Sequence, residues 1–318
     1  MNTYQRYLIE EFADDYHERT MSRRDLLKRA VLIMGSVPAG LSALAAVGCG
    51  GDDDDDTEEA TQALGSPTTP ATPEGSATPS ASPTNAGAGV VTVEEGDFSF
   101  QGPASDLFGY LARPGNDAVH PRILVIHENR GLNEHTKDIA RRYATEGFIA
   151  LAVDLCSRNG GSTTDTARNT GFLGSADPDD LVADMLAYVD HLQGLEGVQA
   201  DGIGVTGFCF GGGYTFETAV ASPEVKAAVP YYGTARNVLS ELATTQAAIL
   251  VMYGANDSRI TSEAEQVRAE LEKSGRPFGI EIYPGANHAF FNDTGSNYNQ
   301  AAAEDAWTKT LAWFRDHL

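Results

Sequence analysis

Short apolar runs alternate with amphipathic segments over residues 89–318 of this 318-residue chain. Residues 123–126 form a wholly apolar run, which predicts a strand buried on both faces, and residues 148–155 predict a second strand. Between them, residues 133–146 have helical spacing, and Gly147 follows as a plausible C-cap. The pattern therefore predicts strands that are separated by helices.

The same alternation continues to the end of the chain. We expect further strands at 202–206, 225–231, 248–253 and 279–283, helices at 177–194, 211–221, 262–274 and 299–318, and a Gly/Ser/Thr-rich loop over 157–176. Residues 90–100 and 106–114, joined by a Gly-Pro turn, predict an antiparallel lead-in pair. Residues 89–318 are thus expected to form one α/β domain with a mostly parallel sheet and helices on both faces. Ligands of such sheets bind at the carboxyl ends of the strands.

The first 48 residues have a different pattern. Ser22-Arg23-Arg24 precedes a moderately apolar run over residues 30–47, which glycine, serine and proline interrupt. The segment resembles a twin-arginine leader, a signal that directs export of a folded protein.

The apolar run ends in Ala46-Val47-Gly48-Cys49, which is similar to a bacterial lipobox. In a lipobox the cysteine is lipidated and becomes the mature N-terminus, although Ala46 stands where leucine is commoner. Three outcomes remain open: lipidation of Cys49, an uncleaved membrane anchor, or simple cleavage. We expect an exported protein that is lipid-anchored on the outer face of the bacterial cytoplasmic membrane, or periplasmic or extracellular.

Residues 49–88 contain mainly Asp, Glu, Thr, Ser, Pro, Ala and Gly, which predicts a disordered acidic tether. The formal net charge of the chain is −23, and the tether contributes eight acidic residues and no basic ones. The predicted domain has 31 acidic and 16 basic residues, a net −15. This charge argues against nucleic-acid binding, and membrane contact is expected only through the leader or a lipid.

The chain has three cysteines, of which Cys156 and Cys209 fall in the domain. The strands that precede them are expected to flank a third strand, so the two thiols should lie roughly 9–10 Å apart. A disulfide needs a shorter α-carbon separation. Both cysteines are therefore predicted to stay free.

The strongest chemical signal is Gly207-Phe208-Cys209-Phe210-Gly211, between a predicted strand and a predicted helix. The glycines permit a sharp turn that projects the central side chain from the edge of the sheet. Unpaired amides at the helix N-terminus favour a thiolate, and the Phe210 amide can donate to an oxyanion. Cys209 is the candidate nucleophile, and a small buried cysteine in a Gly-rich turn is the alternative.

Asp257 and His288 each follow a predicted strand, so they fall at the same edge of the sheet as Cys209. The chain order nucleophile, acid, histidine is that of the α/β-hydrolases. His288 is the candidate base, and Asp257 would orient its ring. Alone, either residue could be an ordinary loop residue.

Glu128 follows the first buried strand in His127-Glu128-Asn129-Arg130. This loop should lie beside the nucleophile, where the Asn129 amide could supply a second oxyanion donor. A carboxylate that faces a thiol can restrain its ionisation, and a surface glutamate in a turn is the alternative. No second histidine completes a zinc motif, so no metal or other cofactor is expected.

These motifs resemble the dienelactone hydrolase family. They are Glu-Asn-Arg-Gly-Leu (128–132), Gly-Phe-Cys-Phe-Gly-Gly (207–212) and Pro-Gly-Ala-Asn-His-Ala-Phe (284–290), with 48 residues from Cys209 to Asp257 and 31 more to His288. The resemblance implies a carboxymethylenebutenolidase-like enzyme with catalytic Cys209, Asp257 and His288, and with Glu128 as the carboxylate that gates the thiol.

The sequence departs from the family pattern at the expected substrate-binding residues. Asn292 occupies a position where well-studied relatives have a carboxylate-binding arginine, and Arg168 and Phe172 align with a second arginine and a tyrosine. Arg130 and Arg158 could substitute for the arginines.

The leading hypothesis is hydrolysis of a small activated lactone or ester through a Cys209 acyl-enzyme, by a monomeric protein. The alternatives are a broader exported esterase or carboxylic hydrolase, and a non-catalytic lipid-anchored binding module.

Overall fold

A computed structural model describes residues 1–17, 21–48, 92–195 and 198–318. Its strands form a single sheet in the order β1-β2-β4-β3-β5-β6-β7-β8, antiparallel from β1 through β4 and parallel from β4 to β8. The strands are β1 (Val93–Gln101), β2 (Asp106–Pro114), β3 (His120–Ile126), β4 (Ile149–Val153), β5 (Val198–Phe208), β6 (Val225–Tyr231), β7 (Ala248–Gly254) and β8 (Phe278–Tyr283). The antiparallel lead-in and the parallel body were both predicted from the sequence.

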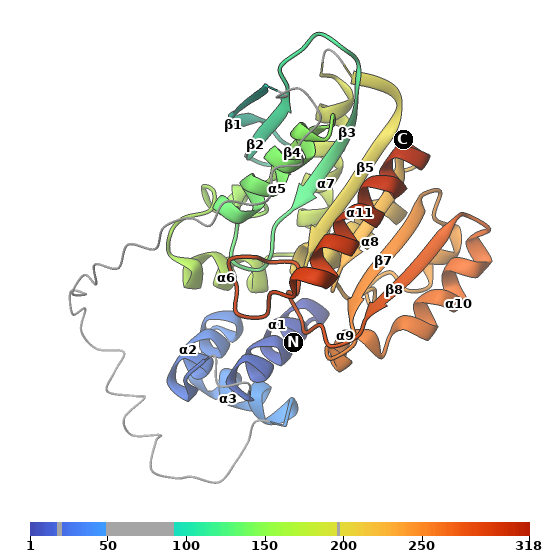
Figure 1. The fold of residues 1–318 in the computed structure, drawn as a ribbon. Helices are drawn as coiled ribbons and strands as arrows, with labels where there is room; N and C mark the ends of the chain where they lie inside the picture. Colours follow the sequence, from blue (N-terminus) through green and yellow to red (C-terminus); the bar gives the residue numbers. More distant parts are fainter. Residues whose placement is uncertain (18–20, 49–91, 196–197) are drawn as a thin grey trace.

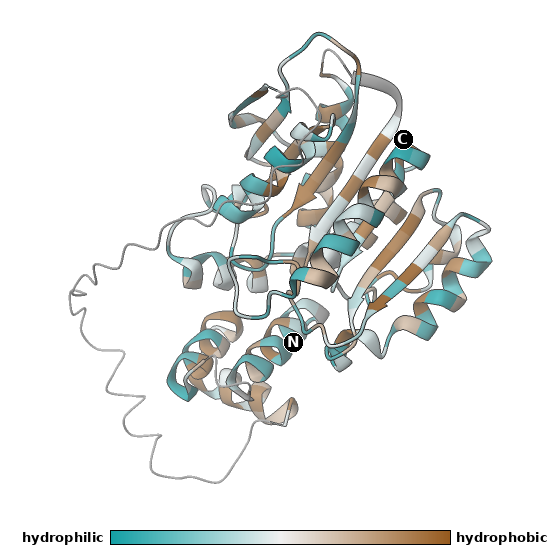
Figure 2. Ribbon diagram, in the orientation of Figure 1, coloured by the Kyte–Doolittle hydropathy of each residue, from teal (hydrophilic) through white to brown (hydrophobic). Residues whose placement is uncertain are grey.

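Helices cover both faces of this sheet (Figure 1). α5 (Glu134–Thr145) and α11 (Gln300–His317) share one face, where Tyr143 packs 4.5 Å from Trp307 between ring centroids. α7 (Pro178–Gln193) and α8 (Phe210–Ala221) contact each other and the central strands on the other face, and α10 (Ala264–Ser274) packs against β8. The apolar strands lie inside these helices (Figure 2), as expected of a sheet buried on both faces.

One predicted loop is wrong. Residues 157–176 contain the short helix η1 (Ser157–Asn159) and the helix α6 (Thr166–Ser175). Asp165 caps α6 by accepting hydrogen bonds from two backbone amides of its first turn. A Cβ on Gly174 would lie 2.9 Å from Ile33 Cγ1, so glycine permits α6 to pack closely against α2 (Arg23–Met34). Gly174, one of the glycines that suggested a loop, instead serves close helix packing.

The N-terminal residues also fold against the domain. α1 (Thr3–His17), α2 and α3 (Val37–Ala46) lie beside the edge where the parallel strands end (Figure 1). Among the described residues, no single helix is long and apolar enough to cross a membrane, although α2 and α3 pass that test as a pair bent by 109°. Cys49 and the predicted tether fall outside the described residues, and export and lipidation remain predictions.

Cys156 and Cys209 are both free thiols, as predicted. They follow β4 and β5, which flank β3 in the sheet. Burial raises the pKa of Cys156 to about 12, so its thiol is neutral and chemically inert near neutral pH.

Candidate active site

Cys209 lies at a strained turn between β5 and α8. Its φ of 56° and ψ of −115° place a non-glycine residue in a sparsely populated backbone region. The turn is possible because Gly207 and Gly211 lack side chains: a Cβ on Gly207 would lie 2.3 Å from the Gly211 carbonyl oxygen, and one on Gly211 2.5 Å from the His127 carbonyl oxygen. Strain held by close packing is typical of a nucleophile at a sharp strand-to-helix turn.

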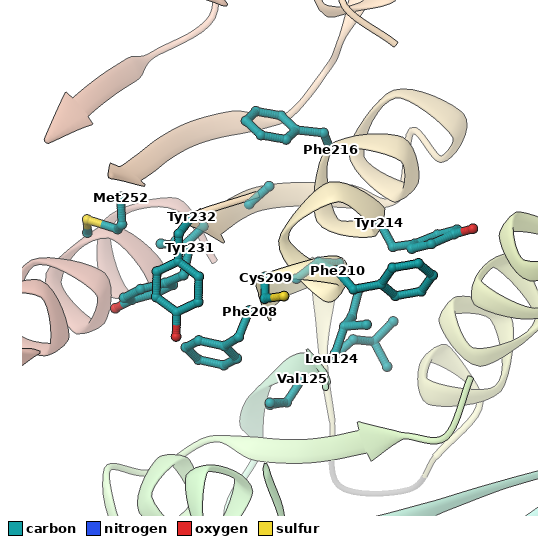
Figure 3. Close-up of a cluster of buried hydrophobic side chains, with 14 of the residues drawn as sticks. Leu124, Val125, Phe208, Cys209, Phe210, Tyr214, Phe216, Tyr231, Tyr232 and Met252 are labelled. Atoms are coloured by element: carbon teal, nitrogen blue, oxygen red, sulfur yellow. The ribbon is translucent and has the colours of Figure 1, made fainter. Parts of the chain in front are cut away.

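The Cys209 side chain is buried among aromatic residues (Figure 3). Phe208 and Phe210 flank it in sequence, and Tyr232 follows the adjacent strand β6. Burial, and next the carboxylate of Glu11, raise the pKa of the Cys209 thiol to about 11. The resting thiol is therefore protonated near neutral pH.

Asp257 and His288 form the second part of the site. They follow β7 and β8, and His288 Nδ1 lies 2.5 Å from Asp257 Oδ2. Burial alone would lower the pKa of His288, but the Asp257 carboxylate and, to a smaller extent, Cys209 together raise that pKa well above its ordinary value. The same pair lowers the pKa of Asp257, despite its burial. The carboxylate therefore orients the ring and stabilises its protonated form.

Cys209 and His288, the candidate nucleophile and base, are close but are not hydrogen-bonded to each other. The Cys209 sulfur, a ring nitrogen of His288 and a carboxylate oxygen of Glu11 all lie within 4.8 Å of one another. Within the described part of the chain, His288 Nε2 is buried and has no hydrogen-bond partner. Cys209 Sγ instead donates to Glu11 Oε2 at 3.3 Å and accepts from the Tyr7 hydroxyl at 3.4 Å. A small shift of the thiol toward His288 would bring the two groups into hydrogen-bond contact.

The amides of Asn129 and Phe210 are available to bind an oxyanion. Among the residues that the structure describes, neither amide donates a hydrogen bond to another protein group. The Asn129 carbonyl accepts from Thr170 Oγ1 at 3.0 Å, and its side-chain amide donates to Glu11 Oε1 at 2.8 Å. These bonds fix the loop while leaving the backbone N–H free.

Glu128 lies near the thiol but is not its hydrogen-bond partner. Its Oε2 accepts from Asn292 Nδ2 at 2.9 Å, whereas Oε1 is buried without a partner within the described residues. Glu128 contributes to the raised pKa of Cys209 less than burial and Glu11 do. The sequence placed a carboxylate against the thiol, but the one that contacts it is Glu11.

A cavity of about 670 Å³ opens over these groups. Its lining includes Cys209, His288, Asp257, Glu128, Asn129, Arg130, Asn292 and, from the N-terminal helices, Glu11, Asp14, Asp15, Asp25 and Arg29. Arg130 and Asn292 are thus at the cavity, as the sequence suggested.

Arg168, Phe172 and Arg158 do not line the cavity. Arg168 and Phe172 belong to α6, where the Arg168 guanidinium is bound by the Asn159 carbonyl and Phe172 packs against the core. Arg158 pairs with Asp184 at 2.8 Å. They were misplaced because the segment that carries them is a helix and not a loop.

The sequence did not predict that residues of α1 and α2 line the cavity. Tyr4, Tyr7, Leu8 and Phe12 are buried and repeat at helical spacing along α1. That spacing, ahead of the paired arginines, was the available signal for a folded helix.

Glu11, Cys209 and His288 are also the one group of possible metal donors among the described residues. Thiolate, imidazole and carboxylate are ligands that transition metals accept. In the structure the Cys209 thiol donates a hydrogen bond to Glu11 Oε2 at 3.3 Å.

A nucleophile, an acid and a histidine in this chain order, at the rim of a mostly parallel sheet, define an α/β-hydrolase. The model of the dienelactone hydrolase family matches residues 107–318. The chain belongs to this family and is an ester or lactone hydrolase.

The relatives each match about 70% of the chain. A Salmonella typhimurium protein assigned as a carboxymethylenebutenolidase is 34% identical over 238 residues, which are 71% of this chain and 88% of that protein. An Escherichia coli protein with the same assignment is 34% identical over 232 residues, 69% of this chain and 86% of that one. The crystal structure of a Klebsiella pneumoniae protein assigned as a dienelactone hydrolase is 31% identical, with a TM-score of 0.63, and covers 71% of this chain and 100% of that one.

Proposed function

We propose that this enzyme hydrolyses small activated esters or lactones through a thioester on Cys209, with His288 as the base and Asp257 as the orienting acid. The observation that carries this proposal is the His288–Asp257 bond at 2.5 Å, which leaves the other ring nitrogen of His288 unpartnered beside the thiol.

Each half-reaction transfers one proton through His288. The ring takes the Cys209 proton, the sulfur attacks the carbonyl carbon, and the Asn129 and Phe210 amides stabilise the oxyanion. The C–O bond then breaks, and the imidazolium returns the proton to the leaving oxygen, which stays tethered if the substrate is a lactone. Water next gives a proton to His288 and attacks the thioester, which releases the acid and regenerates the thiol.

Activated substrates fit this site best. A thiolate is a good leaving group from the tetrahedral intermediate, so the oxygen must leave readily for the forward reaction to compete. Enol and aryl esters meet this need because their oxygens depart as weak bases. We therefore propose a lactone of the dienelactone type or a comparable ester.

The charge of the cavity favours neutral substrates. Its acidic residues are Glu11, Asp14, Asp15, Asp25, Glu128 and Asp257, and its arginines are Arg29, Arg130 and Arg259. Burial, and next repulsion from Arg130, lower the pKa of the Arg29 guanidinium. The net negative lining should repel a carboxylated substrate.

The experiment that tests the function compares a neutral enol lactone, its carboxylated analogue and an aryl acetate as substrates of the full chain. We expect hydrolysis of the neutral compounds, with kcat/KM about tenfold above that of the anionic lactone at low salt. Added salt should narrow this ratio by screening the acidic residues. Failure to hydrolyse any of the three would contradict the proposed function, and a preference for the anion would contradict only the charge argument.

Two other functions were open from the sequence. A broader exported esterase would use the same chemistry, and the substrate comparison separates it from a lactonase. A non-catalytic lipid-anchored module would have no use for a strained, glycine-supported Cys209 turn beside an oriented histidine. Export, a lipid on Cys49 and the monomeric state stay proposals, and mass spectrometry of the mature N-terminus tests the first two.

A further inference from the structure

Helix α1 makes contacts with the catalytic domain that are specific to the active site. Tyr7 and Glu11, one turn apart on α1, both hydrogen-bond the Cys209 sulfur, and Glu11 also accepts from the Asn129 side chain at 2.8 Å. The Glu11 carboxylate thus lies beside the nucleophile and the oxyanion loop. The carbonyl group of a substrate must approach the same two elements.

Further bonds hold α1 in this position away from the thiol. The Tyr4 hydroxyl donates to the buried Glu217 Oε1 on α8 at 2.9 Å, and the Tyr4 ring stacks on Tyr214 at 4.7 Å. Near the other end of the helix, Asp14 pairs with Arg259 at 3.1 Å. Buried hydrogen bonds require defined partners on both sides, so α1 is matched to this surface and does not merely cover it.

Arg259 connects the helix to the catalytic acid. Its guanidinium lies 4.6 Å from the centroid of the Tyr7 ring, a cation–π distance, and it follows Asp257 by two residues. Glu11 and Asp257 both act electrostatically on Arg259. Helix α1 therefore contacts Cys209 directly and, through Arg259, lies beside Asp257.

We propose that α1 is a cap of the working active site, and that its Glu11 is a positioning residue that holds the Cys209 thiol protonated and directed away from His288 until a substrate displaces it. The inference rests on the proposed function, because it assigns Glu11 a task in delivering Cys209 to His288. It also requires that α1 stays attached in the working enzyme, so of the outcomes open at Cys49 it is compatible only with one that retains residues 1–48.

The resting state of the site agrees with this assignment. The thiol donates to Glu11 while His288 Nε2 has no partner within the described residues. Displacement of Glu11 by an acyl group would free the thiol proton for His288 and, at the same step, expose the Asn129 loop. A capped thiol is also protected from alkylation and oxidation when no substrate is present.

The test measures the rate of iodoacetamide labelling of Cys209 in the full chain, read by mass spectrometry of the Cys209 peptide. Glu11→Gln keeps the shape of the side chain and removes its charge, and should speed labelling by about tenfold. Glu10→Gln is the matched control, since Glu10 is on the same helix but pairs with Arg236 at 3.3 Å. The control should stay within about twofold of the wild type.

A second variant acts on the cap without touching the thiol. Tyr4→Phe removes only the hydroxyl that bonds Glu217, so the cap should open more often and labelling should rise about threefold. If Glu11→Gln fails to fold, as judged by its melting curve, Tyr4→Phe decides the question. Labelling equal to that of the wild type in the folded variants would overturn the proposal.

This result is separable from the catalytic assignment. Labelling reports on the thiol whether or not it is acylated during turnover. Full turnover by a Cys209→Ala enzyme would refute the proposed function, whereas unchanged labelling in Glu11→Gln would refute only the role of the cap.

Discussion

Cys209→Ala is expected to lower kcat/KM for an aryl acetate by about 10³-fold or more. The substitution removes the sulfur of the proposed thioester and leaves the flanking glycines, the His288–Asp257 pair and the oxyanion amides in place. A residual rate is expected because the cavity still binds substrate and still polarises its carbonyl.

Cys156→Ala provides the control for this substitution. Cys156 is also buried, but it follows β4, which lies on the opposite side of β3 from β5. Burial raises the pKa of Cys156 to about 12. Its loss should destabilise the fold slightly and leave kcat/KM within about threefold of the wild type. If Cys209→Ala retained more than about a tenth of the activity, Cys209 would not be the nucleophile.

Asp257→Asn is expected to lower kcat by about 10²- to 10⁴-fold with little change in KM. The asparagine amide cannot stabilise the imidazolium. Its N–H can also donate to His288 Nδ1, which would place the ring proton on Nε2, where the base must be free to accept. The bond from His288 Nδ1 to Asp257 Oδ2 is the only one that the structure records for the described His288 ring, so no other group would replace it.

The pH profile gives this variant a second readout. Asp257 raises the pKa of His288, so the wild-type rate should fall as the pH drops through that raised value and the ring becomes protonated. Without the carboxylate the pKa of His288 falls, and the acid limb should move to lower pH. Asp305→Asn, which removes a surface carboxylate paired with Lys309, should leave both rate and profile unchanged. An unshifted acid limb in Asp257→Asn would contradict the assigned base.

The fold was predictable because the pattern of apolar residues in each segment agrees with how that segment is buried. Residues 123–126 are apolar on every side and form the core of β3, while the amphipathic residues 133–146 cover it as α5. The meeting of Cys209, Asp257 and His288 was predictable for the same reason, since a parallel sheet brings the ends of β5, β7 and β8 to one edge.

The errors have a common physical cause, which is packing between segments distant in sequence. Glu11 and Cys209 are 198 residues apart, and no local pattern signals that α1 reaches the thiol. Glu128 does contribute to the raised pKa of Cys209, as the sequence suggested, but its Oε2 accepts a hydrogen bond from Asn292 and the carboxylate that contacts the sulfur is Glu11. Likewise, Gly171 and Gly174 suggested a loop, but in the structure they lie on α6 where it packs against Leu32 and Ile33 of α2.

The most direct test of the central claim is rapid acid quenching of the wild-type enzyme with an aryl acetate, followed by mass spectrometry of its peptides. We predict an acetyl thioester on the peptide that contains Cys209, formed at the rate of the initial burst and absent from Cys209→Ala. Turnover without this adduct, or an acetyl group on another residue that forms at the burst rate, would contradict nucleophilic catalysis by Cys209.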